Sequence, residues 1–404
     1  MVAVAGRTSL GVAGLQAVDR FAIGASALAL FSVVQLAVYA AAQVPMGMLL
    51  DRWGAKRLII GGTIVMAAGQ LVLGVVDTLP PTFIARAFIG LGDAAVLVSL
   101  LRLIPLWFRP RVVPVITQMT GILGQLGQIV SAVPFLAVLL SFGWTAAFGS
   151  LAMVGLLIAL VAALTVRDRP PARPEGDDSN SGQGSASPSL AAPESAPGGL
   201  RSVLTTPGVW LGFFTHFVTL FPSNTFLFLW GVPFLTAGQG VSPARASAVL
   251  TIGTVAGIIA GPVMGELTAR FPERRSWLVL GTVAASTVIW GAVLIPSTPR
   301  PFWLLALLGV VVTIGVVACT IGFDYARTFI PGPQLGTAIG VVNVGGYFAS
   351  LVSILIVGVV LDAVRPSGEY VLGDFRLAFA ALTPLLLIGM TGLLLARRAS
   401  RARE

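Results

Sequence analysis

The stretch that decides the fold is GMLLDRWGAKR at residues 47–57, a compact charged turn at the end of a long apolar run. The stretch GELTARFPERR at 265–275 repeats its glycine and basic positions at the same spacing, 218 residues later. A second matching pair, WFRP at 107–110 and TFIP at 328–331, is separated by 221 residues. Repetition at a nearly constant offset indicates that the chain is a duplicated unit.

The composition outside these turns is that of a membrane protein. Apolar residues make up 56% of the 404 residues and charged residues 10%, with a mean hydropathy of +0.93. Soluble domains carry about 25% charged residues, so this chain has too few charges to cover a surface that faces water. Eleven apolar runs are long enough to span a bilayer. They lie near 24–50, 58–77, 83–107, 115–141, 145–166, 207–235, 247–268, 277–296, 302–326, 335–361 and 375–396.

Duplication predicts a twelfth span, and residues 1–18 are the only segment left for it. As a helix they reach about 27 Å, at about 1.5 Å per residue, against a hydrocarbon core of about 30 Å. We expect an all-α membrane protein of two pseudo-symmetric six-helix bundles, whose first helix is short or truncated. The bundles should occupy 1–166 and 203–404. The Pro-, Gly- and Ser-rich stretch 167–202 between them is expected to be a disordered linker.

Arg and Lys are distributed unevenly between the loops. Seventeen lie on the Asp51 side of the predicted spans, and five lie on the other side, at Arg20, Arg245, Arg300, Arg365 and Arg376. The positive-inside rule therefore places the Asp51 side, the linker and the C-terminus in the cytoplasm. Since 24 of the 25 basic residues are Arg, a GC-rich bacterial genome and a bacterial cytoplasmic membrane are expected. The net charge of +9 reflects this topology, and no nucleic-acid partner is expected.

The run at 47–57 closely resembles motif A of the major facilitator superfamily, and it lies between spans 2 and 3 as in that family. Gly47 allows close helix approach, Asp51 can cap a helix start and pair with an Arg across the loop, and the basic cluster holds the turn. The second copy is degenerate, with Ala269 and Pro272 at the Asp and second Gly positions. The predicted gate residues are Gly47, Asp51, Arg52, Gly54, Lys56 and Arg57, and in the second copy Gly265, Arg270, Arg274 and Arg275.

Other motifs extend the resemblance over nearly the whole chain. The pattern from Arg86 through Gly90 and Gly92 to Ala94 is similar to motif B, which implies alternating access around a central cavity. Span 5 lacks the Gly-Pro of drug antiporters. The glycine-rich runs of spans 5 and 11, the latter including Asn343, loosely resemble nitrate/nitrite porters. However, the Arg that those porters carry in spans 2 and 8 is missing here. Helix packing is the alternative explanation for these glycines.

Charged residues within the spans are the candidates for coupling and substrate binding, because burying a charge in the membrane costs at least about 2.5 kcal/mol. Arg86 and Asp93 share one face of span 4, which is expected to line the cavity. Asp93 is the candidate proton carrier, and a fixed Arg86–Asp93 structural pair is the alternative. Arg7 in the first span is a candidate anion contact, or else its side chain reaches to the interface.

Arg102 and its repeat counterpart Asp324 lie near the cytoplasmic ends of spans 4 and 10. We expect a salt bridge between them that closes this gate, with an Asp324–Arg327 pair at i+3 as the alternative.

Span 7 contains His216, the one histidine of the chain, as well as Pro222 and Asn224. Pro222 should kink the helix near the substrate level. His216 can bind an anion, carry a proton or serve as a packing residue. Together, the candidate coupling and substrate residues are Asp93, Arg86, Arg7, His216, Asn224 and Asn343.

These features predict a secondary active transporter of a small solute, an anionic or zwitterionic metabolite, with protons as an expected coupling partner. The alternatives are an exporter of small organic compounds and a non-transporting membrane scaffold or sensor. No nucleophile–base pair or metal constellation is evident, so we expect no enzyme activity, no metal and no cofactor. The expected assembly is a monomer in the lipid bilayer.

Overall fold

The computed structural model describes residues 2–21, 25–168, 199–330, 332–365 and 370–401. All regular elements in these ranges are helical. Most of the predicted linker lies outside the described residues, and its last part, 199–202, belongs to the short helix α8 (Gly199–Leu204).

The first half of the chain folds into a bundle of six spans. Its short first span is divided into α1 and α2, and Gly143, with φ +82°, separates the fifth and sixth spans within α7. The elements are α1 (Val2–Val12), α2 (Gly14–Phe21), α3 (Ala25–Trp53), α4 (Ala55–Val75), α5 (Leu79–Trp107), the 3-10 turn η1 (Pro110–Val112), α6 (Val113–Val130), the π-helical turn η2 (Ser131–Phe135) and α7 (Leu136–Thr165).

The second half repeats this plan after α8. The regular helix α9 ends at Asn224, two residues after Pro222, and continues as π-helical turns. The elements are α9 (Pro207–Asn224), η3 (Thr225–Trp230), α10 (Gly231–Pro233), η4 (Phe234–Gly238), α11 (Pro243–Arg270), η5 (Pro272–Arg274), α12 (Arg275–Leu294), α13 (Phe302–Ala318), α14 (Ile321–Phe329), η6 (Gly332–Gln334), α15 (Leu335–Val364), α16 (Leu372–Ala380) and α17 (Thr383–Arg401).

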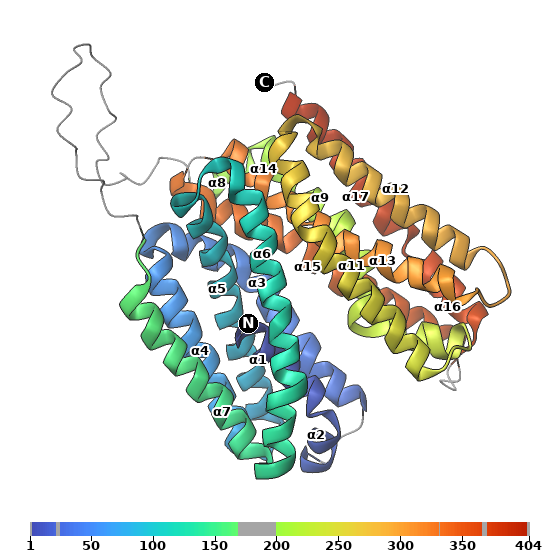
Figure 1. Cartoon of the computed structure of the whole chain (residues 1–404), viewed down its shortest axis with the longest axis horizontal. Coiled ribbons are helices and arrows are strands. Elements are labelled where there is room, and N and C mark those ends of the chain that lie inside the picture. The colour runs from blue at the N-terminus through green and yellow to red at the C-terminus, as the bar shows by residue number, and fades with distance from the viewer. Residues whose placement is uncertain (1, 22–24, 169–198, 331, 366–369, 402–404) are drawn as a thin grey trace.

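Ten helices among the described residues are long and apolar enough to cross a membrane. The α1–α2 pair and α6 lie among them in the first bundle and complete a twelve-span arrangement (Figure 1). Large apolar side chains on the outside of the bundles are exposed, including Leu157, Leu160 and Leu164 on α7. Exposed apolar surface of this extent requires lipid as the solvent. The predicted multi-pass, all-α fold of two six-helix bundles is confirmed.

The two bundles meet along α3 and α15 and along α6 and α11. They lie side by side near α8 and α14, whereas α2 and α16 lie far apart at the opposite end (Figure 1). We call the end near α8 and α14 the Asp51 end, because Asp51 lies there with Gly336 and Arg327. Glycine allows the close contact: a Cβ on Gly47 would lie 2.4 Å from the carbonyl oxygen of Gly336.

Candidate functional site

The centre of the first bundle holds an ion pair between the short first span and α5. The Arg7 guanidinium on α1 donates to Asp93 on α5 from both Nε, at 3.0 Å, and Nη2, at 2.5 Å. The Asp93 side chain is buried, and that of Arg7 remains 23% exposed. The side-on geometry is that of a strong, charge-assisted pair. Asp93 therefore pairs with Arg7 and not with Arg86, its expected partner on the same helix.

Arg86 lies next to this pair, fully buried, with no ion-pair partner among the described residues. Its Nη1 and Nη2 atoms donate to the carbonyls of Gly6 and Arg7 at 3.4 and 3.3 Å, and its Nε has no hydrogen-bond partner. Gln70 donates to the same Gly6 carbonyl, and its own Oε1 accepts no bond. Arg86 thus provides a buried positive charge that the described residues leave uncompensated.

Two tyrosines, one from each bundle, lie in the same region. Tyr39 on α3 and Tyr347 on α15 stack edge to face with 4.7 Å between ring centroids. The Arg7 guanidinium lies 4.9 Å from the Tyr39 ring centroid, and its Nη1 donates to the Tyr347 hydroxyl at 3.4 Å. Gln35, one helical turn before Tyr39, is buried with both side-chain polar atoms unbonded. Aromatic, amide and guanidinium groups from both bundles therefore converge on one place.

A chain of hydrogen bonds connects this region to span 7. His216 lies 3.2 Å through Nδ1 from the Cys319 carbonyl and 2.9 Å through Nε2 from Asn343 Oδ1. Asn343 Nδ2 donates to the Tyr39 hydroxyl at 3.1 Å. All three side chains are buried. The structure therefore brings together the predicted residues His216 and Asn343.

Asn224, by contrast, is not part of the hydrogen-bond chain that includes His216 and Asn343. Its Nδ2 donates to Ser350 Oγ at 3.0 Å, next to a Thr225–Ser353 hydroxyl pair. These contacts join α9 and η3 to α15 within the second bundle.

Asp51 of the motif at 47–57 contacts the other bundle. It accepts hydrogen bonds from Gly336 N at 2.9 Å, Thr337 N at 2.8 Å and Thr337 Oγ1 at 2.6 Å. Asp51 thus caps the start of α15, where the unpaired N–H groups and the helix dipole favour a carboxylate. Arg102 donates to Asp51 at 3.1 Å and to the Leu50 carbonyl at 2.7 Å. Asp51 therefore caps a helix start as expected, and the capped helix is α15 of the other bundle.

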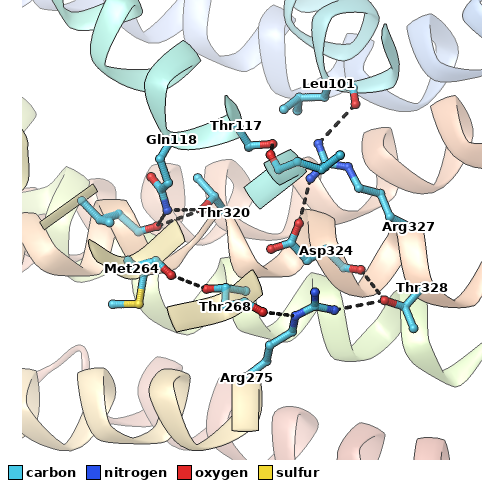
Figure 2. A network of polar contacts seen from close by, with 12 residues as sticks. Leu101, Thr117, Gln118, Met264, Thr268, Arg275, Thr320, Asp324, Arg327 and Thr328 are labelled. Carbon is cyan, nitrogen blue, oxygen red and sulfur yellow. Dashed lines mark hydrogen bonds and ion pairs between the residues drawn. The ribbon is translucent and has the colours of Figure 1, made fainter. Parts of the chain in front are cut away.

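The predicted Arg102–Asp324 salt bridge is not formed, which corrects the sequence-based expectation. Asp324 pairs with Arg327 at 2.8 Å, one turn along α14, and Arg102 pairs with Asp51. The local i+3 spacing brings the partner within reach without ordering a second helix. Arg327 also donates to the Leu101 carbonyl on α5 at 3.2 Å and so joins the two bundles (Figure 2).

A further contact between bundles lies beside Arg327. Gln118 on α6 donates to Thr320 Oγ1 at 2.7 Å and to the Val317 carbonyl at 3.0 Å (Figure 2). Together with Asp51 and Arg327 it holds the bundles together at the Asp51 end.

The remaining residues of the first motif shape the turn itself. Gly54 has φ +83°, a conformation that favours glycine, and precedes α4. The backbone N–H of Lys56 donates to Asp168 Oδ1 at 2.8 Å, which fastens the end of span 6 to the turn. Arg52 and Arg57 are exposed.

The second motif copy occupies the equivalent place in the other bundle. Gly265 packs on α6, where an added Cβ would lie 2.8 Å from the Val115 Cα, as Gly47 packs on α15. Arg275 donates to the Thr268 carbonyl and the Thr328 hydroxyl (Figure 2). Arg270 and Arg274 lie over the Phe271 ring. Ala269 stands at the position equivalent to Asp51, so this copy lacks the counterpart of that carboxylate.

Several residues of the site were not predicted from the sequence: Gln35, Tyr39, Gln70, Thr337 and Tyr347. The tyrosines carried a usable signal, since the chain has only four and these two fall in the middle of apolar spans. Among the described residues, no cluster of His, Cys, Asp or Glu side chains could hold a metal ion.

Comparison with known proteins places this architecture in a family. The model of the Major Facilitator Superfamily matches residues 1–234 and again 212–404. The chain is 24% identical over 361 residues, 85% of its length, to the "Probable nitrate/nitrite transporter NarK2" of two Mycobacterium tuberculosis strains, covering 82% of those proteins. It is 28% identical over 164 residues, 40% of its length, to the "Probable L-galactonate transporter" of Escherichia coli K12, covering 36% of that protein.

Solved structures agree on the fold. A bacterial homologue of the human lysosomal transporter Spinster, in inward-facing unoccupied and occupied conformations, aligns with TM-scores of 0.56 and 0.55 at 18% identity. The alignments cover 98% of this chain and 94% of the homologue. Because the family model matches both halves of the chain, this protein belongs to the Major Facilitator Superfamily and is a membrane transporter, not an enzyme.

Proposed function

We propose that this transporter moves a small anion, a hydroxylated carboxylate in the first instance, by alternating access. The proposal rests on Arg86, whose guanidinium is fully buried and has no carboxylate partner among the described residues. Two arginines meet one aspartate in this region, which leaves one positive charge for the solute to neutralise. An isolated buried charge raises the free energy of the protein, so a bound anion next to Arg86 would offset part of that cost.

The chemistry around Arg86 supports a carboxylate with hydroxyl groups. A guanidinium binds a carboxylate through two parallel hydrogen bonds. The unbonded amide atoms of Gln35 and Gln70 can bind hydroxyl groups, and the tyrosine pair offers an aromatic surface for a carbon chain. The relatives named for L-galactonate and for nitrate/nitrite would both carry anions. L-Galactonate is therefore the first probe and nitrate the second.

The direction of access follows from charge and from packing. The excess of Arg and Lys in loops on the Asp51 side supports a cytoplasmic location for that end and for the C-terminus. The inter-bundle bonds of Asp51, Arg327 and Gln118 all lie at that end. We infer that this conformation is closed toward the cytoplasm and that the motif residues act as its gate.

Binding to the purified full chain in lipid nanodiscs tests the proposal. L-Galactonate and nitrate are titrated by calorimetry into wild type and into Arg86→Gln, which keeps polarity but removes the charge. Removing one charged partner of a buried pair costs about 2–5 kcal/mol, so affinity should fall at least about thirtyfold. The matched control is Arg300→Gln, whose guanidinium donates to the carbonyl of its neighbour Thr298.

Unchanged affinity in Arg86→Gln would contradict the assignment of the site. Binding of a neutral sugar alcohol in place of either anion would contradict the anionic substrate class. Tracer uptake into proteoliposomes then distinguishes transport from binding alone.

A further inference from the structure

We propose that His216 is the proton-binding site of this transporter and that the side-chain amide of Asn343 and the hydroxyl of Tyr39 connect it to the anion site. The inference rests on the proposed anion transport for its physiological meaning. The geometry that carries it lies between α9, α15 and α3 and is independent of which anion is bound.

The two ring nitrogens of His216 face different kinds of partner. Nδ1 faces the Cys319 carbonyl, which can only accept, so Nδ1 carries a hydrogen in either charge state. Nε2 is therefore the atom that gains or loses the proton. It faces Asn343 at 2.9 Å, and an amide side chain presents either an acceptor oxygen or a donor nitrogen.

The orientation of Asn343 must follow the charge of the ring. In the observed orientation Oδ1 faces Nε2 and Nδ2 faces the Tyr39 hydroxyl, which fits a ring with hydrogens on both nitrogens. For a neutral ring the amide turns over, so that Nδ2 donates to Nε2 and Oδ1 faces Tyr39. Either orientation gives both ring nitrogens of His216 and both polar atoms of the Asn343 side chain a hydrogen-bond partner.

Turning the amide reverses the hydrogen bond at Tyr39. With the ring neutral, the Tyr39 hydroxyl must donate to Asn343. With the ring protonated, it accepts from Asn343, and its own hydrogen is released for another acceptor. Tyr39 lies against Arg7, with 4.9 Å from the guanidinium carbon to the ring centroid. An anion held by Arg7 and Arg86 is the acceptor that this released hydrogen would meet.

Proton and anion binding therefore reinforce one another. Protonation adds one positive charge and frees one hydroxyl donor on the side where the anion binds. By linkage, the anion favours the protonated ring by the same factor. The transfer is balanced: a hydronium ion gives its proton to Nε2 on one side of the membrane, and Nε2 returns it to water on the other side.

The other titratable and charged groups around His216 are few. Cys319 precedes α14, and the Tyr347 ring on α15 lies 6.4 Å from the imidazole. Beyond Tyr39 lie Arg7 and Asp93, which pair with each other. Asp324 and Arg327, farther along α14, also form an ion pair. On the remaining neighbours of α9, helix α13 carries no charged residue, α8 carries Arg201, and α12 and α17 carry Arg275, Arg397, Arg398 and Arg401.

The single histidine of the chain makes a direct experiment possible. Full-length protein labelled with ¹⁵N-histidine in nanodiscs gives two ring nitrogen signals that need no assignment by mutation. Between about pH 3 and pH 9 these signals should pass from a doubly protonated ring to the Nδ1–H tautomer. A ring that stays in one state over this range, or a neutral ring in the Nε2–H tautomer, would overturn the proposal.

Transport supplies the second readout. In proteoliposomes loaded with buffer, a gradient of one pH unit should raise L-galactonate or nitrate accumulation about tenfold for each proton moved. The ratio of uptake with and without the gradient should fall to about one in His216→Gln and to well below the wild-type ratio in Tyr39→Phe. Tyr325→Phe removes a buried hydroxyl that contacts Ser276 and is not part of the hydrogen-bond chain from His216 to Tyr39. This variant should keep the wild-type ratio.

The two proposals fail in different ways. A gradient response that persists in His216→Gln overturns the proton site, even if anion transport is confirmed. The proton site is also overturned if the wild type exchanges tracer anion but its uptake does not respond to a pH gradient. If neither anion is bound or exchanged, the proposed function fails, and the histidine signals still decide whether the ring binds a proton by the Nδ1–H route.

Discussion

Asp51 and Thr337 lie 286 residues apart in the sequence, and each belongs to a different bundle. The Asp51 carboxylate accepts from the Thr337 backbone N–H at 2.8 Å and from its hydroxyl at 2.6 Å. A short acidic side chain at the end of α3 thereby caps the first turn of α15. The bond is charge-assisted and can be broken without unfolding either bundle, which suits a gate.

Removing the charge of Asp51 should open this end of the transporter. Hydrogen bonds to charged groups contribute about 1.5–3 kcal/mol, so Asp51→Asn should shift the closed-to-open ratio by about tenfold to a hundredfold. Spin labels at Thr165→Cys and Glu273→Cys, exposed positions on different bundles at the Asp51 end, would report it. With Cys319→Ser as background, pulsed EPR should show a new, longer distance.

The matched control is Asp362→Asn, at the opposite end, where the carboxylate accepts from the Tyr370 hydroxyl. Its distance distribution should equal that of the wild type. An identical distribution in Asp51→Asn would show that the cap does not hold the gate.

Gly336→Ala should weaken the closed state through sterics alone. The added Cβ would lie 2.8 Å from the Gly47 carbonyl oxygen and 2.6 Å from Asp51 Oδ1, so α3 and α15 must separate. Overpacking of this kind costs about 1–3 kcal/mol. The same EPR distance should lengthen, and the melting temperature should fall.

Gly281→Ala on α12 is the control for this change, since an added Cβ there meets no atom within 4 Å. It should keep or raise the melting temperature, because alanine is the better helix former. Equal losses in both variants would indicate a general effect of the methyl group and not a helix contact.

Asp93→Asn should make stability depend on the anion. Breaking a buried ion pair costs about 3–5 kcal/mol, because the partner charge is left uncompensated. Here Arg7 would join Arg86 as an unpaired guanidinium, so L-galactonate or nitrate should raise the melting temperature more in the variant than in the wild type. Differential scanning fluorimetry measures both shifts.

Asp77→Asn serves as its control, as Asp77 pairs with Arg20 and is 71% exposed. Exposed pairs contribute about 0–1 kcal/mol, so little change is expected. If anions stabilise Asp93→Asn no more than wild type, the carboxylate is not what the substrate replaces.

Exchanging charges distinguishes the observed ion pairs from the expected one. Asp324→Arg combined with Arg327→Asp keeps an i+3 pair on α14 and should recover part of the uptake that either single change removes. Recovery should be incomplete, because the bond from Arg327 to the Leu101 carbonyl is lost. Exchanging Arg102 and Asp324 should restore nothing, and recovery there would show that these two residues pair in another conformation.

Much of the architecture could be predicted from the chain alone. The apolar runs and the repeated turn at 47–57 and 265–275 predicted the twelve helices and the duplication. Each depends on local sequence, because a helix in lipid satisfies its backbone hydrogen bonds within the segment. The boundaries of the two predicted bundles and of the linker remain predictions.

The partners of the buried charges needed the tertiary structure. Helical periodicity placed Arg86 and Asp93 on one face, but Asp93 pairs with Arg7, which lies on another helix. Repeat symmetry matched Arg102 with Asp324, but each has a partner elsewhere. Side-chain reach and helix packing decide such pairs, and a periodic pattern contains no information on either.

The sequence by itself determined that this protein is a duplicated helical membrane protein with a charged turn at one end. Hydrophobicity and backbone hydrogen bonding set those features segment by segment. Only the tertiary structure decided that Asp51 caps a helix of the other bundle, that Arg86 is left uncompensated and that His216 is connected to Tyr39. Those relationships join residues from different helices, and the close packing of the two bundles brings them within hydrogen-bond distance.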